Sequence, residues 1–171
     1  SDVCSSDLRL IFAQSVMLGL QPKSALAEKI KVDWAELMKG GYNNPSGLAL
    51  ILSGATTAQA AELKSTALGL LAKQAKSNAA GTYFEIRERD GYYYWYNDRE
   101  ETTAQVLNAL LSAGAQKQIA VRDVVSYLMA QKKQHRWRST KLSALITRGF
   151  AAYALQTGEK PGKTRVTAVV D

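Results

Sequence analysis

The sequence predicts an all-α fold assembled from helical hairpins, and three observations lead to this class. Apolar residues recur at helical spacing along most of the chain, 46% of which is hydrophobic. Glycine, proline and asparagine interrupt these segments at intervals that suit short helices. A weak internal repeat also places a tryptophan, a Ser/Thr pair and an apolar helix in the same order twice, so that Thr103 and Thr140 stand 37 residues apart. This spacing suits one helical hairpin per repeat.

The first half of the chain predicts four helices. Gln21-Pro22 separates the first two, because proline disfavours the helical conformation in the residue before it. The stretch Asn43-Asn44-Pro45-Ser46 predicts a turn followed by an N-cap, and Gly54 is expected to close the short helix after it. The predicted ranges of the four helices are 9–20, 23–38, 47–53 and 57–76.

Residues 82–96, TYFEIRERDGYYYWY, predict a β-hairpin inserted among the helices. The segment is rich in residue types that favour strands, and Asp90-Gly91 lies between its two arms. A tight hairpin turn needs residues that tolerate a positive φ, which this pair provides. We therefore expect two antiparallel strands joined at Asp90-Gly91.

Three more helices follow the hairpin. Asp98 and Glu101 have the spacing of a capping box, which predicts a helix start. Gly158 is expected to end the last helix, because glycine readily adopts the left-handed conformation of a C-terminal cap. Residues at helical spacing in the three segments are Val106, Leu107, Leu110 and Leu111, then Val121, Val124, Val125, Leu128 and Met129, then Leu142, Leu145, Ile146, Phe150 and Tyr153.

The two ends differ from the middle of the chain. Residues 1–8, SDVCSSDL, can be encoded by a string that resembles a short-read sequencing adapter, so we expect a non-native scar there. After Pro161 the pattern alternates with a period of two, which predicts a strand. The expected organisation is a scar over 1–8, a helical domain over 9–158, and a linker with the first strand of a following β domain over 159–171.

Composition argues against several kinds of site. Cys4, the one cysteine, falls in the expected scar, and His135 is the one histidine. We therefore expect no cysteine nucleophile, zinc site or Ser-His pair, and we predict no catalytic residue, metal or cofactor. No apolar run of about 18 residues occurs that could span a bilayer. The formal net charge is +7, with a basic cluster formed by Lys132, Lys133, His135, Arg136, Arg138, Lys141 and Arg148.

Three segments together resemble the late part of the thioester (complement-like) domain of bacterial alpha-2-macroglobulins. They read DREETTAQVLNALL, VVSYLMAQKK and WRSTKLSALITRGFAAYAL. The family pattern is an acidic residue and two threonines at a helix start, then a tryptophan, Ser-Thr, and a long alanine-rich helix that ends near a tyrosine. The loop before the tryptophan departs from that pattern, because it is basic where the family has glycines. The matching residues are Glu101, Thr102, Thr103, Trp137, Ser139, Thr140 and Tyr153, and Trp95 is the counterpart of Trp137 in the repeat.

This resemblance implies an incomplete α/α toroid that serves as scaffold in a protease trap and is not itself an enzyme. In such proteins, cleavage of a bait segment triggers a rearrangement that encloses the protease or exposes a thioester to it. The implied partners are proteases, met through the full-length protein, and other domains of the same chain. The implied location is the periplasm or cell envelope, with any membrane anchor outside this fragment.

The resemblance also implies structural roles for the motif residues. Trp95 and Trp137 are expected to anchor the starts of helical hairpins. Four hydroxyl side chains are expected to form hydrogen bonds at helix starts, and six apolar residues to pack the inner wall of the toroid. The hydroxyl residues are Thr102, Thr103, Ser139 and Thr140, and the apolar ones are Val106, Leu110, Val124, Leu128, Leu145 and Ile146.

Other readings of the same residues remain open. α/α toroids also host carbohydrate-active and terpenoid-cyclising enzymes, in which Asp98, Glu100 and Glu101 could serve as acids or bases, although a capping box accounts for two of the three. The aromatic run over 92–96 could be a glycan-stacking platform. The basic cluster could attract nucleic acid or an anionic membrane. No nucleic-acid-binding motif accompanies it, so a nucleic-acid partner is not predicted.

Overall fold

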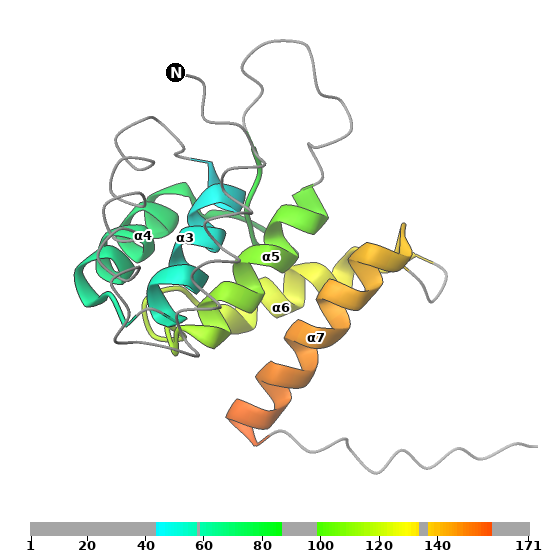
Figure 1. Ribbon diagram of the computed structural model, residues 1–171. Coiled ribbons are helices and arrows are strands. Elements are labelled where there is room, and N and C mark those ends of the chain that lie inside the picture. The colour runs from blue at the N-terminus through cyan, green and yellow to red at the C-terminus, as the bar shows by residue number, and fades with distance from the viewer. Residues whose placement is uncertain (1–43, 58, 87–98, 134–136, 159–171) are drawn as a thin grey trace, which may run out of the picture.

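The computed structural model describes residues 44–57, 59–86, 99–133 and 137–158, which are mostly helical (Figure 1). The predominance of helix in these ranges confirms the predicted all-α class. A small antiparallel sheet lies between the second and third described helices in the chain. The predicted helices over 9–20 and 23–38 and the predicted strand over 159–171 lie outside the described residues. The elements are α3 (Pro45–Thr57), α4 (Ala61–Gln74), β1 (Lys76–Asn78), β2 (Gly81–Tyr83), α5 (Arg99–Ser112), α6 (Val121–Ala130) and α7 (Thr140–Thr157).

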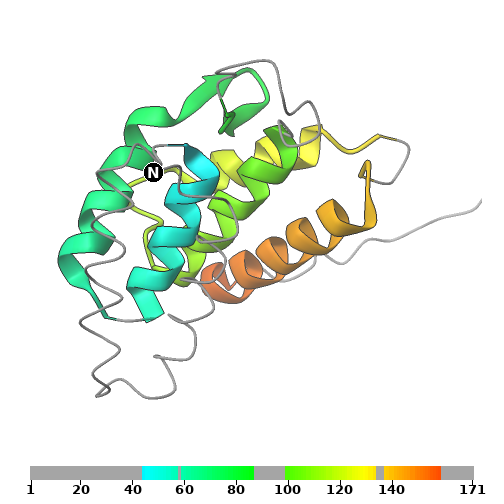
Figure 2. The same ribbon diagram turned by 45° about the horizontal axis from the view of Figure 1, so that its top comes forward.

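Helices α3, α5 and α7 form a row with α5 in the middle (Figures 1 and 2). α5 contacts both of its neighbours, whereas α4 packs against α3 and α6 packs against α5. Each of the first two helices of the row is therefore paired with the helix that follows it in the chain. This arrangement agrees with the helical hairpins expected from the internal repeat, and α7 stands where a third hairpin would begin.

Contacts between α5 and α7 fix their relative direction. Glu101 and Lys141 form an ion pair near the two helix starts, with 2.5 Å between Oε1 and Nζ. Halfway along, the side-chain amide of Asn108 donates to the Leu145 carbonyl at 2.9 Å. The Gln156 amide donates to a carbonyl in the last turn of α5 at 3.1 Å. The two helices therefore run parallel, and Asn108 and Leu145 are separated by the same 37 residues as the repeated threonines.

The parallel pair is close because α7 carries a glycine at the crossing. A Cβ atom at Gly149 would lie 2.8 Å from Leu107 Cδ2 and 3.3 Å from the Asn108 amide nitrogen. Both contacts are closer than side chains normally allow, so a larger residue here would require Leu107 and Asn108 to shift, whereas glycine lets the helices approach without displacing them. The hydrogen bond from Asn108 to α7 depends on that approach.

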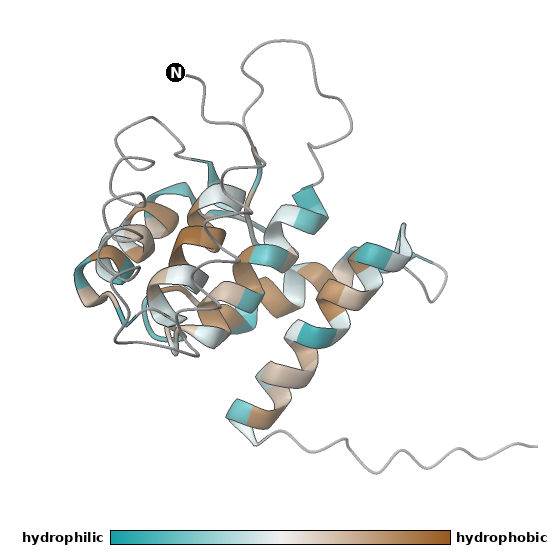
Figure 3. Ribbon diagram, viewed as in Figure 1, coloured by the Kyte–Doolittle hydropathy of each residue, from teal (hydrophilic) through white to brown (hydrophobic). Residues whose placement is uncertain are grey.

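The core is centred on α5, most of whose residues are buried and which contacts α3, α6 and α7. Figure 3 shows the hydrophobic segments of these helices in brown. Of the six residues predicted to pack the inside, Leu145 is half-buried and the other five are fully buried: Val106, Leu110, Val124, Leu128 and Ile146. Met129 stands at helical spacing with Val124 and Leu128, but its side chain is 51% exposed. Successive helical residues are rotated by about 100°, so Met129 turns away from the core when Val124 and Leu128 face it.

Two of the helix ends are set by the residues nearest to them, and a third is not. Asn44 Oδ1 accepts a hydrogen bond from the Gly47 N–H at 2.8 Å, which makes Asn44 the N-cap of α3. Gly158 ends α7 with a φ of 70°, as predicted. Gly54 does not end α3, which continues to Thr57. It is buried inside the helix, where packing against α4 and α5 outweighs the weak helix propensity of glycine.

The described β-hairpin lies upstream of the predicted one. Thr82, expected in the first arm of a hairpin that turns at Asp90-Gly91, lies in the second strand and pairs with Ser77. The Asn78 side chain accepts a hydrogen bond from the Ala80 N–H at 2.9 Å, which stabilises the turn between β1 and β2. The sequence did not predict this hairpin because β1 consists of Lys, Ser and Asn, which carry little strand propensity. The turn predicted at Asp90-Gly91 lies outside the described residues.

Gly81 lies where the hairpin backbone comes close to α6, and replacing it tests that close approach. Its φ is +133°, and a Cβ there would lie 2.2 Å from the Asp123 carbonyl oxygen of α6. We predict that Gly81→Ala lowers the free energy of unfolding by about 2 to 4 kcal/mol, because it adds backbone strain and separates the hairpin from α6. Urea denaturation followed by circular dichroism measures this change.

Gly69→Ala is the matched control. Gly69 lies inside α4, and a Cβ there would meet no atom within 4 Å. The same substitution should raise the free energy of unfolding by about 0.5 to 1 kcal/mol, because alanine favours helix. Equal stability of the two variants would contradict the close approach of β2 to α6.

Candidate functional site

Seven of the eight motif residues lie in the described part of the chain. Six of them lie at or just before the starts of α5 and α7, and Tyr153 lies towards the end of α7. Trp95 falls outside the described residues. Thr102 and Thr103 are buried, whereas Ser139 and Thr140 are exposed. Their positions are as follows: Glu101, Thr102 and Thr103 in α5, Trp137 and Ser139 before α7, and Thr140 and Tyr153 within it.

Trp137 ties the end of α6 to α7. Its indole Nε1–H donates to the Leu128 carbonyl in the last turns of α6 at 3.2 Å. Its ring meets Phe150 of α7 edge to face, with the centroids 6.0 Å apart. Tryptophan suits this position because it combines a large apolar surface with one hydrogen-bond donor. These contacts match the anchoring role predicted for Trp137.

Ser139 is the N-cap of α7. Its Oγ accepts a hydrogen bond from the Leu142 N–H at 3.1 Å, and its backbone is extended. The first N–H groups of a helix lack partners within the helix, so a cap of this kind stabilises it by about 1 kcal/mol. The predicted helix-start hydrogen bond is therefore present at Ser139, and Thr140 is the first residue of the helix.

Thr103 forms contacts that differ from its predicted role. Its side chain is fully buried, and Oγ1 accepts a hydrogen bond from the Phe84 N–H at 3.0 Å and donates to the Phe84 carbonyl at 3.2 Å. One hydroxyl group thus satisfies both backbone polar groups of Phe84, whose ring is also fully buried. Thr103 therefore holds the segment after β2 against α5 and does not cap the start of the helix.

Glu101 belongs to a polar chain that crosses all three helices of the row. It pairs with Lys141 of α7 and accepts a hydrogen bond at 3.1 Å from the side-chain amide of Gln105. Gln105 in turn accepts a hydrogen bond from Ser46 at the start of α3. The Lys141 side chain is 62% exposed, so the ion pair adds little stability. The chain of contacts as a whole joins the starts of the three helices.

A second cluster, which the sequence did not predict, lies where the hairpin meets α5 and α6. The Arg99 guanidinium is 4.9 Å from the Tyr83 ring centroid, and Tyr83 stacks on Tyr127 of α6 with centroids 5.1 Å apart. Arg99 Nη2 is 2.8 Å from Glu85 Oε2, and Lys76 pairs with the other oxygen of that carboxylate. The sequence offers one signal for this cluster, which is the alternation of Tyr83 and Glu85 along the chain. Their partners could not be predicted, because they are distant in the sequence.

The cluster shifts the pKa values of its members. The hydrogen bond from Lys76, followed by the charge of Arg99, lowers the pKa of Glu85 although partial burial opposes this. Burial raises the pKa of Tyr127, and a hydrogen bond with Arg99 limits the rise. Burial alone would lower the pKa of Arg99, but Glu85 and Tyr127 raise it. Each shift except that of Tyr127 favours the charged form, so the cluster acts as a fixed ionic clamp.

The described residues offer contacts for holding structure in place and little reactive chemistry. Among them, no three Asp, Glu, His or Cys side chains come together in a way that could hold a metal ion. The helices in these ranges include none that is long and apolar enough to cross a membrane. No known protein-family profile matches the chain, and a search of curated proteins finds no match.

Replacement of Thr103 tests the clamp on Phe84. Thr103→Val keeps the shape of the side chain but leaves the buried Phe84 N–H and carbonyl without partners. We predict a loss of about 2 kcal/mol in the free energy of unfolding, measured by urea denaturation. Thr103→Ser retains the hydroxyl and removes one methyl group, so it should cost about 1 kcal/mol. A valine variant as stable as the parent would show that the hydroxyl does not hold this segment.

Protonation of Glu85 should weaken the ionic clamp at low pH. The pKa of Glu85 is lowered from 4.5 in the fold, so its contribution to stability is present above that value and lost as the pH falls below it. The difference in stability between the parent and Glu85→Gln should stay constant from neutral pH to about pH 5 and then shrink. Denaturation curves at several pH values measure it, and a difference that stays constant down to the lowest pH would contradict the clamp.

Proposed function

We propose that this chain is the scaffold portion of a bacterial alpha-2-macroglobulin-like protease trap, in which it forms part of an α/α toroid. The observation that carries the proposal is the parallel contact of α5 and α7, whose matching residues are offset by the 37 residues of the sequence repeat. Stacked helical hairpins place equivalent helices side by side and parallel, and a ring of such hairpins is a toroid. The row α3, α5 and α7 is compatible with an arc of that ring.

The contacts of the motif residues support a structural role. Trp137 binds the backbone of α6, Ser139 caps α7, and Thr103 holds the hairpin against α5. Each of these side chains satisfies a backbone group of a neighbouring element, which is what a scaffold requires. A catalytic group would instead be aimed at a site open to a substrate.

In the proposed protein, the toroid would respond to events elsewhere in the molecule. A protease cleaves a bait segment outside this chain, and the whole protein rearranges to enclose the enzyme or to expose a thioester to it. The partners of the toroid would be other domains of the same protein, and the location would be the cell envelope. The helical row then serves as a rigid body that moves as a unit and is not itself chemically changed.

The full-length protein, incubated with trypsin, tests this proposal. We expect a limited cleavage, a more compact species in native electrophoresis, and protease that co-elutes with the protein in size-exclusion chromatography. The captured protease should still cleave small chromogenic peptides and should lose activity on large protein substrates. Trypsin with a blocked active site is the control, since it cannot cut the bait.

Two outcomes would contradict the protease-trap proposal. In the first, the full-length protein is cleaved but neither compacts nor retains the protease. In the second, compaction follows addition of the blocked protease as readily as the active one, which would make cleavage irrelevant to the change.

A further inference from the structure

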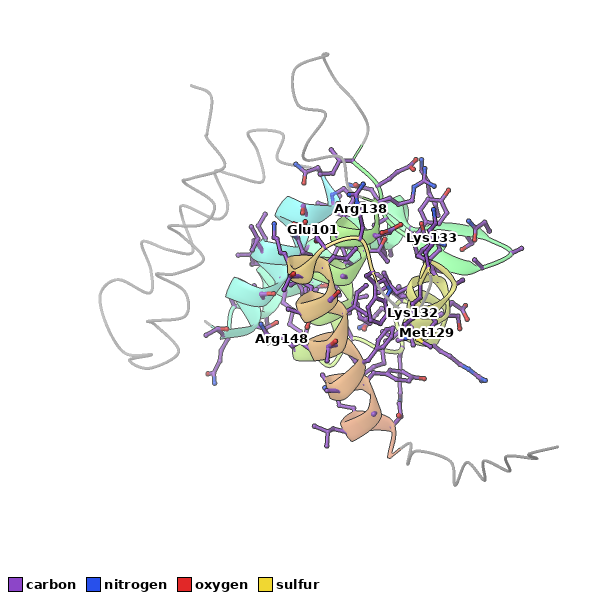
Figure 4. All side chains as sticks on the ribbon, turned by 90° about the vertical axis from the view of Figure 1, so that its right-hand side faces the viewer. Glu101, Met129, Lys132, Lys133, Arg138 and Arg148 are labelled. Atoms are coloured by element: carbon purple, nitrogen blue, oxygen red, sulfur yellow. The ribbon has the colours of Figure 1, made fainter. Side chains whose placement is uncertain are left out.

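We propose that the end of α6 and the turn after it form a contact surface for anionic lipid bilayers. The surface consists of Met129, Lys132 and Lys133, and we refer to it as the Met-Lys surface. It lies on one side of α7, and Arg148 lies on the other (Figure 4). The inference does not depend on the protease-trap proposal.

The charge around this surface has one sign. Residues 124–158 contain six Lys and Arg residues and neither Asp nor Glu. Lys132 and Lys133 are exposed within this stretch, at the turn that follows α6. A run of like charges without nearby carboxylates in sequence creates a positive potential that attracts anionic surfaces. Lysines near a negatively charged leaflet each add to that attraction.

Met129 supplies the apolar part of the surface. Its side chain is 51% exposed, and among the described residues the one other large hydrophobic side chain reported as exposed is Leu155. Lys132 and Lys133 follow Met129 by three and four residues, and the Lys132 N–H donates to the Met129 carbonyl at 3.2 Å. Lys132 lies next to Met129, and Lys133 lies farther away on the same side of α7 (Figure 4). An exposed apolar side chain beside a lysine can enter the interface of a bilayer while the ammonium group stays at the headgroups.

The fold holds this surface in a fixed position. The Lys132 Nζ lies 5.3 Å from the centroid of the Trp137 ring. That ring is held by its hydrogen bond to Leu128 and by its contact with Phe150. The lysine is therefore presented by a supported aromatic side chain, which lowers the conformational entropy lost on binding.

The composition favours lipid over other anionic partners. Protein interfaces are depleted in lysine. Nucleic-acid phosphates attract lysine as well as arginine, but they offer no apolar layer for an exposed methionine. Met129 with the two lysines instead suits the boundary between headgroups and acyl chains. Lys141 is paired with Glu101, and Arg148 lies apart, so the surface is small. Binding should therefore be weak and sensitive to salt.

Vesicle sedimentation with the full chain tests the Met-Lys surface. The probe is large vesicles of equal parts phosphatidylglycerol and phosphatidylcholine, compared with phosphatidylcholine alone. We expect binding to the anionic vesicles only, and replacement of Lys132 and Lys133 by serine should weaken it roughly tenfold or more. The same double change at Lys64 and Lys73 of α4 is the matched control, because it removes equal charge from another helix.

A fluorescence measurement tests insertion of the methionine separately. In a Cys4→Ser background, Met129→Cys carries a nitrobenzoxadiazole label, and Leu155→Cys carries the same label as control. A blue shift on addition of anionic vesicles is expected at position 129 and not at position 155.

Three results would overturn the inference. One is an equal loss of binding in the α4 control, which would indicate general charge attraction. Another is an unchanged fluorescence spectrum of the label at position 129 when anionic vesicles are added. The third is binding of an oligonucleotide or an acidic peptide that is tighter than vesicle binding and lost with the same two lysines. Circular dichroism of each variant confirms that it is folded.

Discussion

The side-chain amide of Asn108 is the contact on which the arrangement of the helices depends. It donates to the Ala104 carbonyl in its own helix and to the Leu145 carbonyl in α7, at 2.8 and 2.9 Å. The second bond is possible only where the two backbones come close, and Gly149 provides that approach. A polar side chain at a helix crossing fixes register more strictly than apolar packing, because a shifted register would lose the bond to Leu145. The parallel packing of α5 and α7 follows from this constraint.

α5 also organises the elements on its other sides. Thr103 fastens the backbone after β2, and Arg99 connects to the hairpin and to α6 through Glu85 and Tyr127. α5 therefore contacts the hairpin near its start, α3 and α7 on either side, and α6, the helix that follows it in the chain. These contacts involve backbone groups and matched charges, which stabilise one arrangement of the elements around α5. The scaffold role proposed above rests on them.

Features set by neighbouring residues could be predicted from the sequence, and features set by distant ones could not. Ser139 starts α7 and Gly158 ends it, each through contacts within a few residues. Both roles were predicted correctly. The apolar faces of α5, α6 and α7 follow from periodicity, apart from Met129 at the edge of its face. Thr103 appeared to start a helix, but its partner Phe84 lies 19 residues away. The hairpin of β1 and β2 was not predicted, because Thr82 pairs with a polar strand whose sequence gives no sign of it.

The central claim is that α5 and α7 are parallel and in register, and carbodiimide cross-linking tests it most directly. The reagent joins carboxylates and amines that are already in contact. The account predicts an amide between Glu101 and Lys141, found by mass spectrometry of tryptic peptides, because these groups meet at the two helix starts. The Lys76–Glu85 pair is an internal positive control. Recovery of the control link without the Glu101–Lys141 link would contradict the parallel arrangement and the toroid built on it.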